Sequence, residues 1–96
     1  MNNKEIIEIL RDYKEHSEYS DNILSLGLFG SHARGDDTEI SDIDVFVALK
    51  INKMFDLIGI KQDLEELTQR KIDIVLLHQS MNKFLMNRIL HEGLYV

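Results

Sequence analysis

The sequence predicts an α/β (α+β) domain in which a small sheet is flanked by about four helices. The first observation is the apolar pattern, which alternates between helical spacing and short strand-like runs. It gives the order helix, strand, short helix, strand, helix, strand, helix, and this alternation is typical of helices layered on a sheet. The second is size: 96 residues, 44% apolar and 29% charged, predict one domain over residues 1–96 with a sufficient but thin core.

The first half of the chain predicts one long helix, a short helix and two strands. Residues 3–15 carry apolar side chains at helical spacing, with polar residues opposite. The apolar positions of this helix are Ile6, Ile7, Leu10 and Tyr13. Residues 23–29 form a short apolar run that indicates a buried strand, and residues 30–41 are turn-rich with room for one short helix near Ser31. Residues 42–49 are β-branched and aromatic, which favours a second strand.

The second half predicts a helix, a strand and a closing helix. Residues 54–69 form the helix, although Gly59 costs about 1 kcal/mol there relative to alanine, which close packing or a bend would explain. Its apolar stripe is Leu57, Ile60, Leu64 and Leu67. Residues 71–77 predict the third strand, and residues 80–92 the last helix, with Gly93 as its C-terminal cap. The residues expected to point inward from the last helix are Phe84, Leu85 and Ile89.

Composition excludes several classes of function. The absence of cysteine excludes disulfides and thiolate metal sites and fits a reducing cytoplasm. Charges interrupt the apolar positions of the first 15 residues, which excludes a signal peptide or membrane span there. A net charge of −6 argues against direct nucleic-acid binding, which needs Lys and Arg. The histidines lack ligand spacing and are predicted at the surface or its boundary: His16, His32, His78 and His91.

Residues 30–44 contain the pattern that carries chemistry, Gly30-Ser31 followed by ten residues and then Asp42-x-Asp44. Carboxylates two apart on a strand project from one face, and they repel each other unless something compensates. Divalent cations do so, and oxygen ligands suit Mg²⁺ or Mn²⁺. Gly30 allows a backbone geometry closed to other residues, and Ser31 offers a hydroxyl and an amide at a helix start, where anions bind. The pattern predicts metal-assisted phosphoryl transfer.

A third acid, Asp73, is expected to complete the pair formed by Asp42 and Asp44. It lies in the third predicted strand as an acid among apolar residues. For the three acids to meet, the third strand must run parallel to the second. For the Gly30-Ser31 turn to face the same point, the first strand must run antiparallel to the second. We therefore expect a mixed three-stranded sheet.

These residues resemble the nucleotidyltransferase signature of the DNA polymerase β-like superfamily. The fuller string, GSHARG followed by SDID, is similar to its minimal nucleotidyltransferase (MNT) group, and the resemblance covers essentially the whole chain. It implies a nucleotidyltransferase fold and a two-metal transfer of a nucleoside monophosphate, AMP from ATP, to an acceptor hydroxyl. It implies that Asp42 and Asp44 bind both Mg²⁺ ions, and that Asp73 holds the catalytic metal and helps deprotonate the acceptor.

The same resemblance implies the nucleotide contacts. Gly30 and Ser31 would hold the β- and γ-phosphates of the leaving pyrophosphate. Arg34 matches the arginine of the GSxARG string, with phosphate contact and a structural ion pair both open, and Ser41 matches the serine of SDxD. His32 replaces an aromatic or aliphatic residue that is common in this group.

Small stand-alone members of the group are paired with HEPN-domain proteins, several as toxin–antitoxin modules in which the transferase adenylylates the HEPN ribonuclease. One alternative is an antitoxin that masks such a ribonuclease by binding alone. A transferase of the aminoglycoside-modifying kind is a weaker alternative, because 96 residues leave no room for a drug-binding second domain. A partner chain or self-association is expected to complete the open cleft, with Met86 and Leu90 near that interface.

Overall fold

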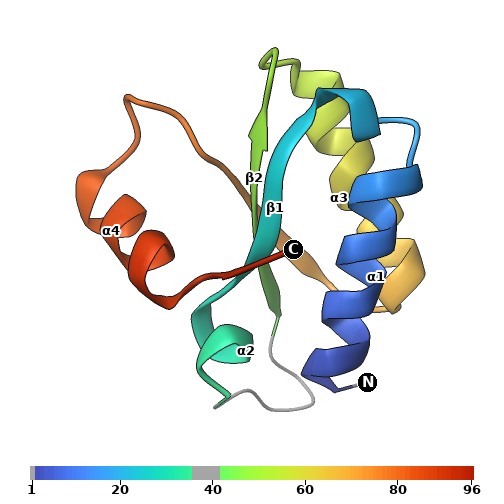
Figure 1. The fold of residues 1–96 in the computed structure, drawn as a ribbon, viewed down its shortest axis with the longest axis horizontal. Helices are drawn as coiled ribbons and strands as arrows, with labels where there is room; N and C mark the ends of the chain where they lie inside the picture. The colour runs from blue at the N-terminus through green and yellow to red at the C-terminus, as the bar shows by residue number, and fades with distance from the viewer. Residues whose placement is uncertain (1, 36–41) are drawn as a thin grey trace.

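A four-stranded mixed sheet with the strand order β3-β2-β1-β4 forms the centre of the molecule (Figure 1). The computed structural model describes residues 2–35 and 42–96. The elements are α1 (Asn3–His16), η1 (Ser20–Asn22), β1 (Ile23–Phe29), α2 (Gly30–Arg34), β2 (Ile43–Leu49), α3 (Met54–Thr68), β3 (Ile72–Leu76), α4 (Lys83–Glu92) and β4 (Leu94–Tyr95). Strand β2 pairs antiparallel with β1 and parallel with β3, which confirms the predicted mixed arrangement.

The strand count was wrong by one, because the last residues of the chain add a fourth strand. Leu94 and Tyr95 pair antiparallel with Leu28 and Gly27 on the free edge of β1, and the N–H of Val96 donates to the carbonyl of Leu26 at 2.9 Å. A two-residue strand has no periodicity of its own, so only the pairing with β1 reveals it.

Helices α1 and α3 cover one face of the sheet and enclose the main core with it (Figure 1). Asn2 caps α1 by accepting a hydrogen bond from the N–H of Glu5 at 2.9 Å. The core residues come from these two helices and from alternate positions of the strands: Ile6, Leu10, Tyr13, Ile23, Leu26, Leu28, Ile43, Val45, Val47, Leu49, Ile60, Leu64 and Ile72. This alternation leaves Asp44 and Phe46 on the other face of β2.

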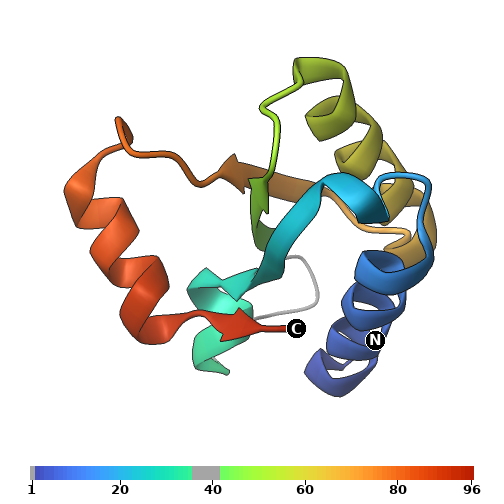
Figure 2. The ribbon, with the colours of Figure 1, turned by 45° about the horizontal axis from the view of Figure 1, so that its top comes forward.

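Phe46 anchors a second, smaller packing layer on that other face. Its ring is fully buried and lies 4.8 Å, centroid to centroid, from the ring of Tyr95 in an edge-to-face contact. Gly27 and Gly93 leave room for it, since a Cβ on either would crowd the Phe46 ring. Helix α4 stands on this side of the sheet, away from α1 and α3 (Figures 1 and 2).

Three expectations for the helices need correction. Helix α4 begins at Lys83, because the side chain of Asn82 caps it by accepting from the N–H of Leu85 at 3.1 Å. Phe84 is 75% exposed and Leu67 is 52% exposed, so the inward stripes of α4 and α3 are narrower than the sequence pattern indicated. The reason is that a side chain at the margin of a helical stripe is buried only if another element covers it.

Gly59 has a neighbour that the sequence did not reveal. A Cβ there would overlap the hydroxyl of Tyr19 and lie 2.6 Å from its Cζ. The glycine therefore makes room for a tyrosine from the loop before β1, rather than for the sheet. In the described part of the chain, no helix is both long and apolar enough to cross a membrane.

Candidate active site

The parallel pairing of β2 and β3 places two of the predicted acids side by side. Asp44 and Asp73 are direct Cα partners in the register, and the N–H of Ile43 donates to the carbonyl of Lys71 at 3.0 Å, which fixes the start of this pairing. Asp42 directly precedes β2 and is half-buried. The three carboxylates thus gather at the end of the sheet where β2 and β3 begin.

The Gly30 backbone approaches the same acids from β1. Phe29, the last residue of β1, is the Cα partner of Asp44, so Gly30 follows directly beside it. Gly30 has a φ of +72°, in the left-handed region that favours glycine. A Cβ on Gly30 would overlap an Asp44 carboxylate oxygen and lie 3.1 Å from its Cγ. Only glycine combines this backbone conformation with this close approach.

Electrostatics mark Asp44 as the centre of the cluster. Burial raises the pKa of Asp44 above its ordinary value, and the negative charges of Asp73 and Asp42 raise it further. The positive charge of Arg34 acts in the opposite direction on the same pKa. A carboxylate that is partly desolvated and surrounded by like charge is destabilised until a cation joins it, and such perturbed groups concentrate at functional sites.

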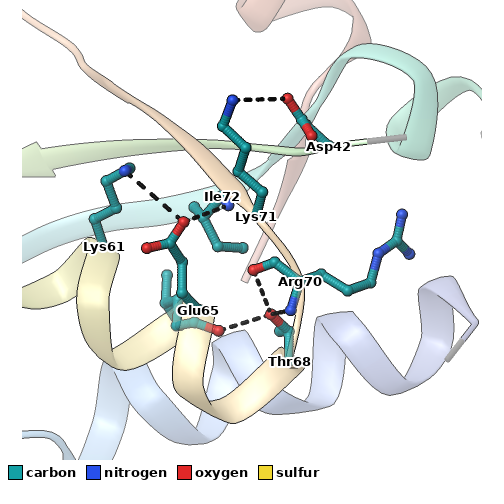
Figure 3. A network of polar contacts seen from close by, with 8 residues as sticks. Asp42, Lys61, Glu65, Thr68, Arg70, Lys71 and Ile72 are labelled. Carbon is teal, nitrogen blue, oxygen red and sulfur yellow. Dashed lines mark hydrogen bonds and ion pairs between the residues drawn. The ribbon is translucent and has the colours of Figure 1, made fainter. Parts of the chain in front are cut away.

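Asp42 has a protein cation as its neighbour. Its Oδ2 lies 3.7 Å from Nζ of Lys71, the residue two before Asp73 (Figure 3). The Lys71 side chain is exposed and that of Asp42 is only half-buried, so this ion pair is weak and can open. In residues 2–35 and 42–96, no three His, Asp or Glu side chains converge tightly enough to hold a metal ion as they stand. The donor set nevertheless fits Mg²⁺, because three carboxylates lie at one sheet end and the negative charges of Asp42 and Asp73 act on Asp44.

The remaining predicted residues lie around this cluster. Ser31 is half-buried in the first turn of α2. Arg34, at the end of α2, lies 3.6 Å from the Glu92 carboxylate of α4, so an ion pair is formed, while its charge also acts on Asp44. Ser41 lies outside the described residues.

His32 is the residue that the sequence reasoning placed wrongly. It was expected at the surface or its boundary but is fully buried, with Nδ1 2.9 Å from the side-chain oxygen of Asn3 and Nε2 3.4 Å from a guanidinium nitrogen of Arg70. The three residues come from α1, α2 and the turn before β3, so no local pattern could connect them. The one local signal was a polar residue directly after Gly30-Ser31.

A hollow of about 360 Å³, lined by residues of α1 and α3 such as Tyr13 and Asp63, lies apart from this cluster. None of the three acids lines it. The candidate active site is therefore the sheet end, which is separate from this hollow.

A mixed sheet with three carboxylates at one end, beside a left-handed glycine turn, is the arrangement expected of a nucleotidyltransferase. The chain belongs to the polymerase β nucleotidyltransferase family, whose profile matches residues 4–96. It is similar to the protein adenylyltransferase MntA of Thermococcus cleftensis, with 30% identity over 94 residues that cover 97% of this chain and 94% of that one. A candidate protein adenylyltransferase of Methanocaldococcus jannaschii is 40% identical over 70 residues, covering 72% of this chain and 74% of that one.

Solved structures agree with this family. A minimal nucleotidyltransferase matches with a TM-score of 0.79 and 26% identity, covering 98% of this chain and 95% of that one. One chain of a toxin–antitoxin crystal structure with AMP-PNP matches with a TM-score of 0.72 and 25% identity, covering 99% of this chain and 72% of that one. These matches confirm the expected nucleotidyltransferase fold.

Proposed function

We propose that this protein is a Mg²⁺-dependent adenylyltransferase that moves AMP from ATP to a hydroxyl group on a HEPN-domain toxin, and so acts as its antitoxin. The observation that carries the proposal is the approach of the Gly30 turn to Asp44 beside its strand partner Asp73. In this proposal the triphosphate would lie along the Gly30 turn, directly next to the carboxylates that would bind the metal ions. The relatives named as protein adenylyltransferases and the toxin–antitoxin structure with AMP-PNP support the donor and the partner.

The proposed reaction uses each site residue in a distinct way. Asp42, Asp44 and Asp73 would hold the cations, which, when bound, supply positive charge against the charge that develops on the phosphates. Gly30 and Ser31 would hold the β- and γ-phosphates. The acceptor oxygen forms a bond to the α-phosphorus while the bond from that phosphorus to the β-phosphate oxygen breaks, so that pyrophosphate leaves. Asp73 would accept the proton that the acceptor hydroxyl loses.

Arg34 and Ser41 are proposed to assist nucleotide binding. Arg34 would lend positive charge to the bound phosphates, because its charge already acts on Asp44, and its pairing with Glu92 would then hold it in place. Ser41 would contribute to nucleotide binding through its place beside Asp42 in the sequence.

We place the partner on the side of the sheet that carries α4. Phe84 and Leu90 on this helix are 75% and 56% exposed, and Met86 is half-buried. We expect these side chains to contact the partner, because a contiguous exposed apolar surface marks a protein contact. Absence of cysteine, and the need for ATP, fit activity in the cytoplasm.

The test is transfer of label from α-labelled ATP to a HEPN-domain toxin mixed with this protein. Asp44→Asn and Asp73→Asn should each reduce transfer at least about a hundredfold, whereas the exposed Asp21→Asn, a matched change on η1, should leave it unchanged. Transfer by Asp44→Asn at the wild-type rate would contradict the mechanism. Neutralisation of the toxin that survives loss of the three aspartates would instead favour an antitoxin that acts by binding alone.

A further inference from the structure

The burial of the polar side chain of His32 has to be explained by its contacts with neighbouring residues. It is fully buried, and a buried polar side chain normally requires hydrogen-bond partners. It belongs to α2, which has five residues, far fewer than the roughly 12–15 that an isolated helix needs to be even marginally stable. The orientation of α2, and of the Gly30-Ser31 turn that begins it, must therefore come from tertiary contacts.

Asn3 supplies the first of these contacts, from the first turn of α1. Its side-chain N–H donates to the backbone carbonyl of His32, which fixes the orientation of the amide. The amide oxygen then faces Nδ1 of the His32 ring at 2.9 Å. Because that oxygen is only an acceptor, Nδ1 carries a proton and donates it. One asparagine thus holds both the backbone and the side chain of His32.

Arg70 supplies the second contact, from the turn before β3. A guanidinium nitrogen lies 3.4 Å from Nε2 of His32, and since a guanidinium only donates, Nε2 is the acceptor. The Arg70 backbone is itself held, because its N–H donates to the Thr68 hydroxyl at 3.3 Å, and that hydroxyl donates to the carbonyl of Leu64 at 2.7 Å (Figure 3). Arg70 precedes Asp73 by three residues.

We propose that Asn3, His32 and Arg70 form a positioning unit that sets the place of the Gly30-Ser31 turn relative to the acids on β2 and β3. One side of the His32 ring is tied to α1, the other to the turn that leads into Asp73, and its backbone continues directly from Ser31. The unit therefore fixes the distance between the phosphate-binding turn and the carboxylates. This inference rests on the proposed function, because its consequence is affinity for a nucleoside triphosphate.

The experiment measures the binding of Mg²⁺ with α,β-methylene-ATP, which cannot transfer its AMP, by calorimetry. His32→Phe keeps an aromatic ring but has no ring nitrogens, and it should weaken binding about tenfold, as should Asn3→Ala. The double variant should be no weaker than about the worse single variant, because both changes break one unit. His32→Asn restores an N–H donor toward Asn3 and should bind within about threefold of wild type.

Two controls separate positioning from general loss of stability. Ile60→Val removes a methylene from the core on α3 and lowers the free energy of unfolding, but should leave nucleotide binding unchanged. Affinity for Mn²⁺ alone should stay within about twofold in His32→Phe, because the three carboxylates remain. The inference would be overturned if His32→Phe bound nucleotide as tightly as the wild type, or if Ile60→Val weakened nucleotide binding equally. The proposed function would stand in either case. A wild-type protein that binds no Mg²⁺–triphosphate would overturn the proposed function, and the inference with it.

Discussion

Replacing Gly30 by alanine tests whether this glycine is needed for the site or only for the backbone. At a φ of +72°, an alanine costs about 1–2 kcal/mol because its Cβ crowds the following carbonyl. The new Cβ would also lie 3.1 Å from Cγ and 3.3 Å from Cβ of Asp44, whose backbone is fixed in β2. Such overpacking adds about 1–3 kcal/mol, so we expect a total loss of about 2–5 kcal/mol.

Gly35 provides a matched control for the backbone part of this cost. Its φ of +81° is similar, and among the described residues a Cβ there meets nothing within 4 Å. Gly35→Ala should therefore lose only about 1–2 kcal/mol, which is a fall in Tm of about 4–16 °C for a chain of this size. Urea unfolding of the two variants measures the difference directly.

Activity should separate the two variants more strongly than stability does. Label transfer, measured where both proteins are folded, should fall about a hundredfold in Gly30→Ala, because a displacement of about 1 Å at a reacting centre has that effect. Gly35→Ala should keep at least about a third of wild-type transfer. Equal activity of the two folded variants would refute the idea that close approach to Asp44 is why position 30 is glycine.

Three further predictions concern charge, packing and pH. Asp44→Asn should abolish transfer yet raise the Tm of the metal-free protein at pH 7. Burial and the two neighbouring acids raise the pKa of Asp44, so the ionised form of this side chain destabilises the fold. An unchanged or lower Tm in calorimetry would contradict this prediction. Gly59→Ala should destabilise the wild type through overlap with Tyr19, but in a Tyr19→Ala background it should stabilise by about 0.5–1 kcal/mol through helix propensity; urea unfolding of the four proteins decides. Burial and the 2.7 Å hydrogen bond to Asp63 raise the pKa of the Tyr13 phenol, so the folded state holds this proton more tightly than the unfolded state. The contribution of this phenol to the free energy of unfolding is therefore complete below about pH 10 and is lost as pH rises above that value. In Tyr13→Phe, the free energy of unfolding should decline less steeply above about pH 10 than in the wild type. An identical decline in the two proteins would exclude this assignment.

The sequence predicted the elements that carry the acids because their signals are local. Asp42 and Asp44 are two apart on a strand, and the demand that Asp73 join them required β3 to run parallel to β2, as it does. The antiparallel direction of β1 followed from the same demand on Gly30. The sequence predicted burial wrongly at the margins of the helical apolar stripes, since Phe84 was expected to point inward and is exposed.

By itself, the sequence determined the order of the elements, the sheet directions and the family, because periodicity and the spacing of Gly30, Ser31 and the acids are properties of short segments. Only the tertiary structure decided that Leu94 and Tyr95 extend the sheet. It alone decided that His32 lies buried between Asn3 and Arg70. The physical reason is that both outcomes depend on contacts between segments far apart in the chain, and no local pattern records which distant residue will satisfy an unpaired strand edge or a buried ring nitrogen.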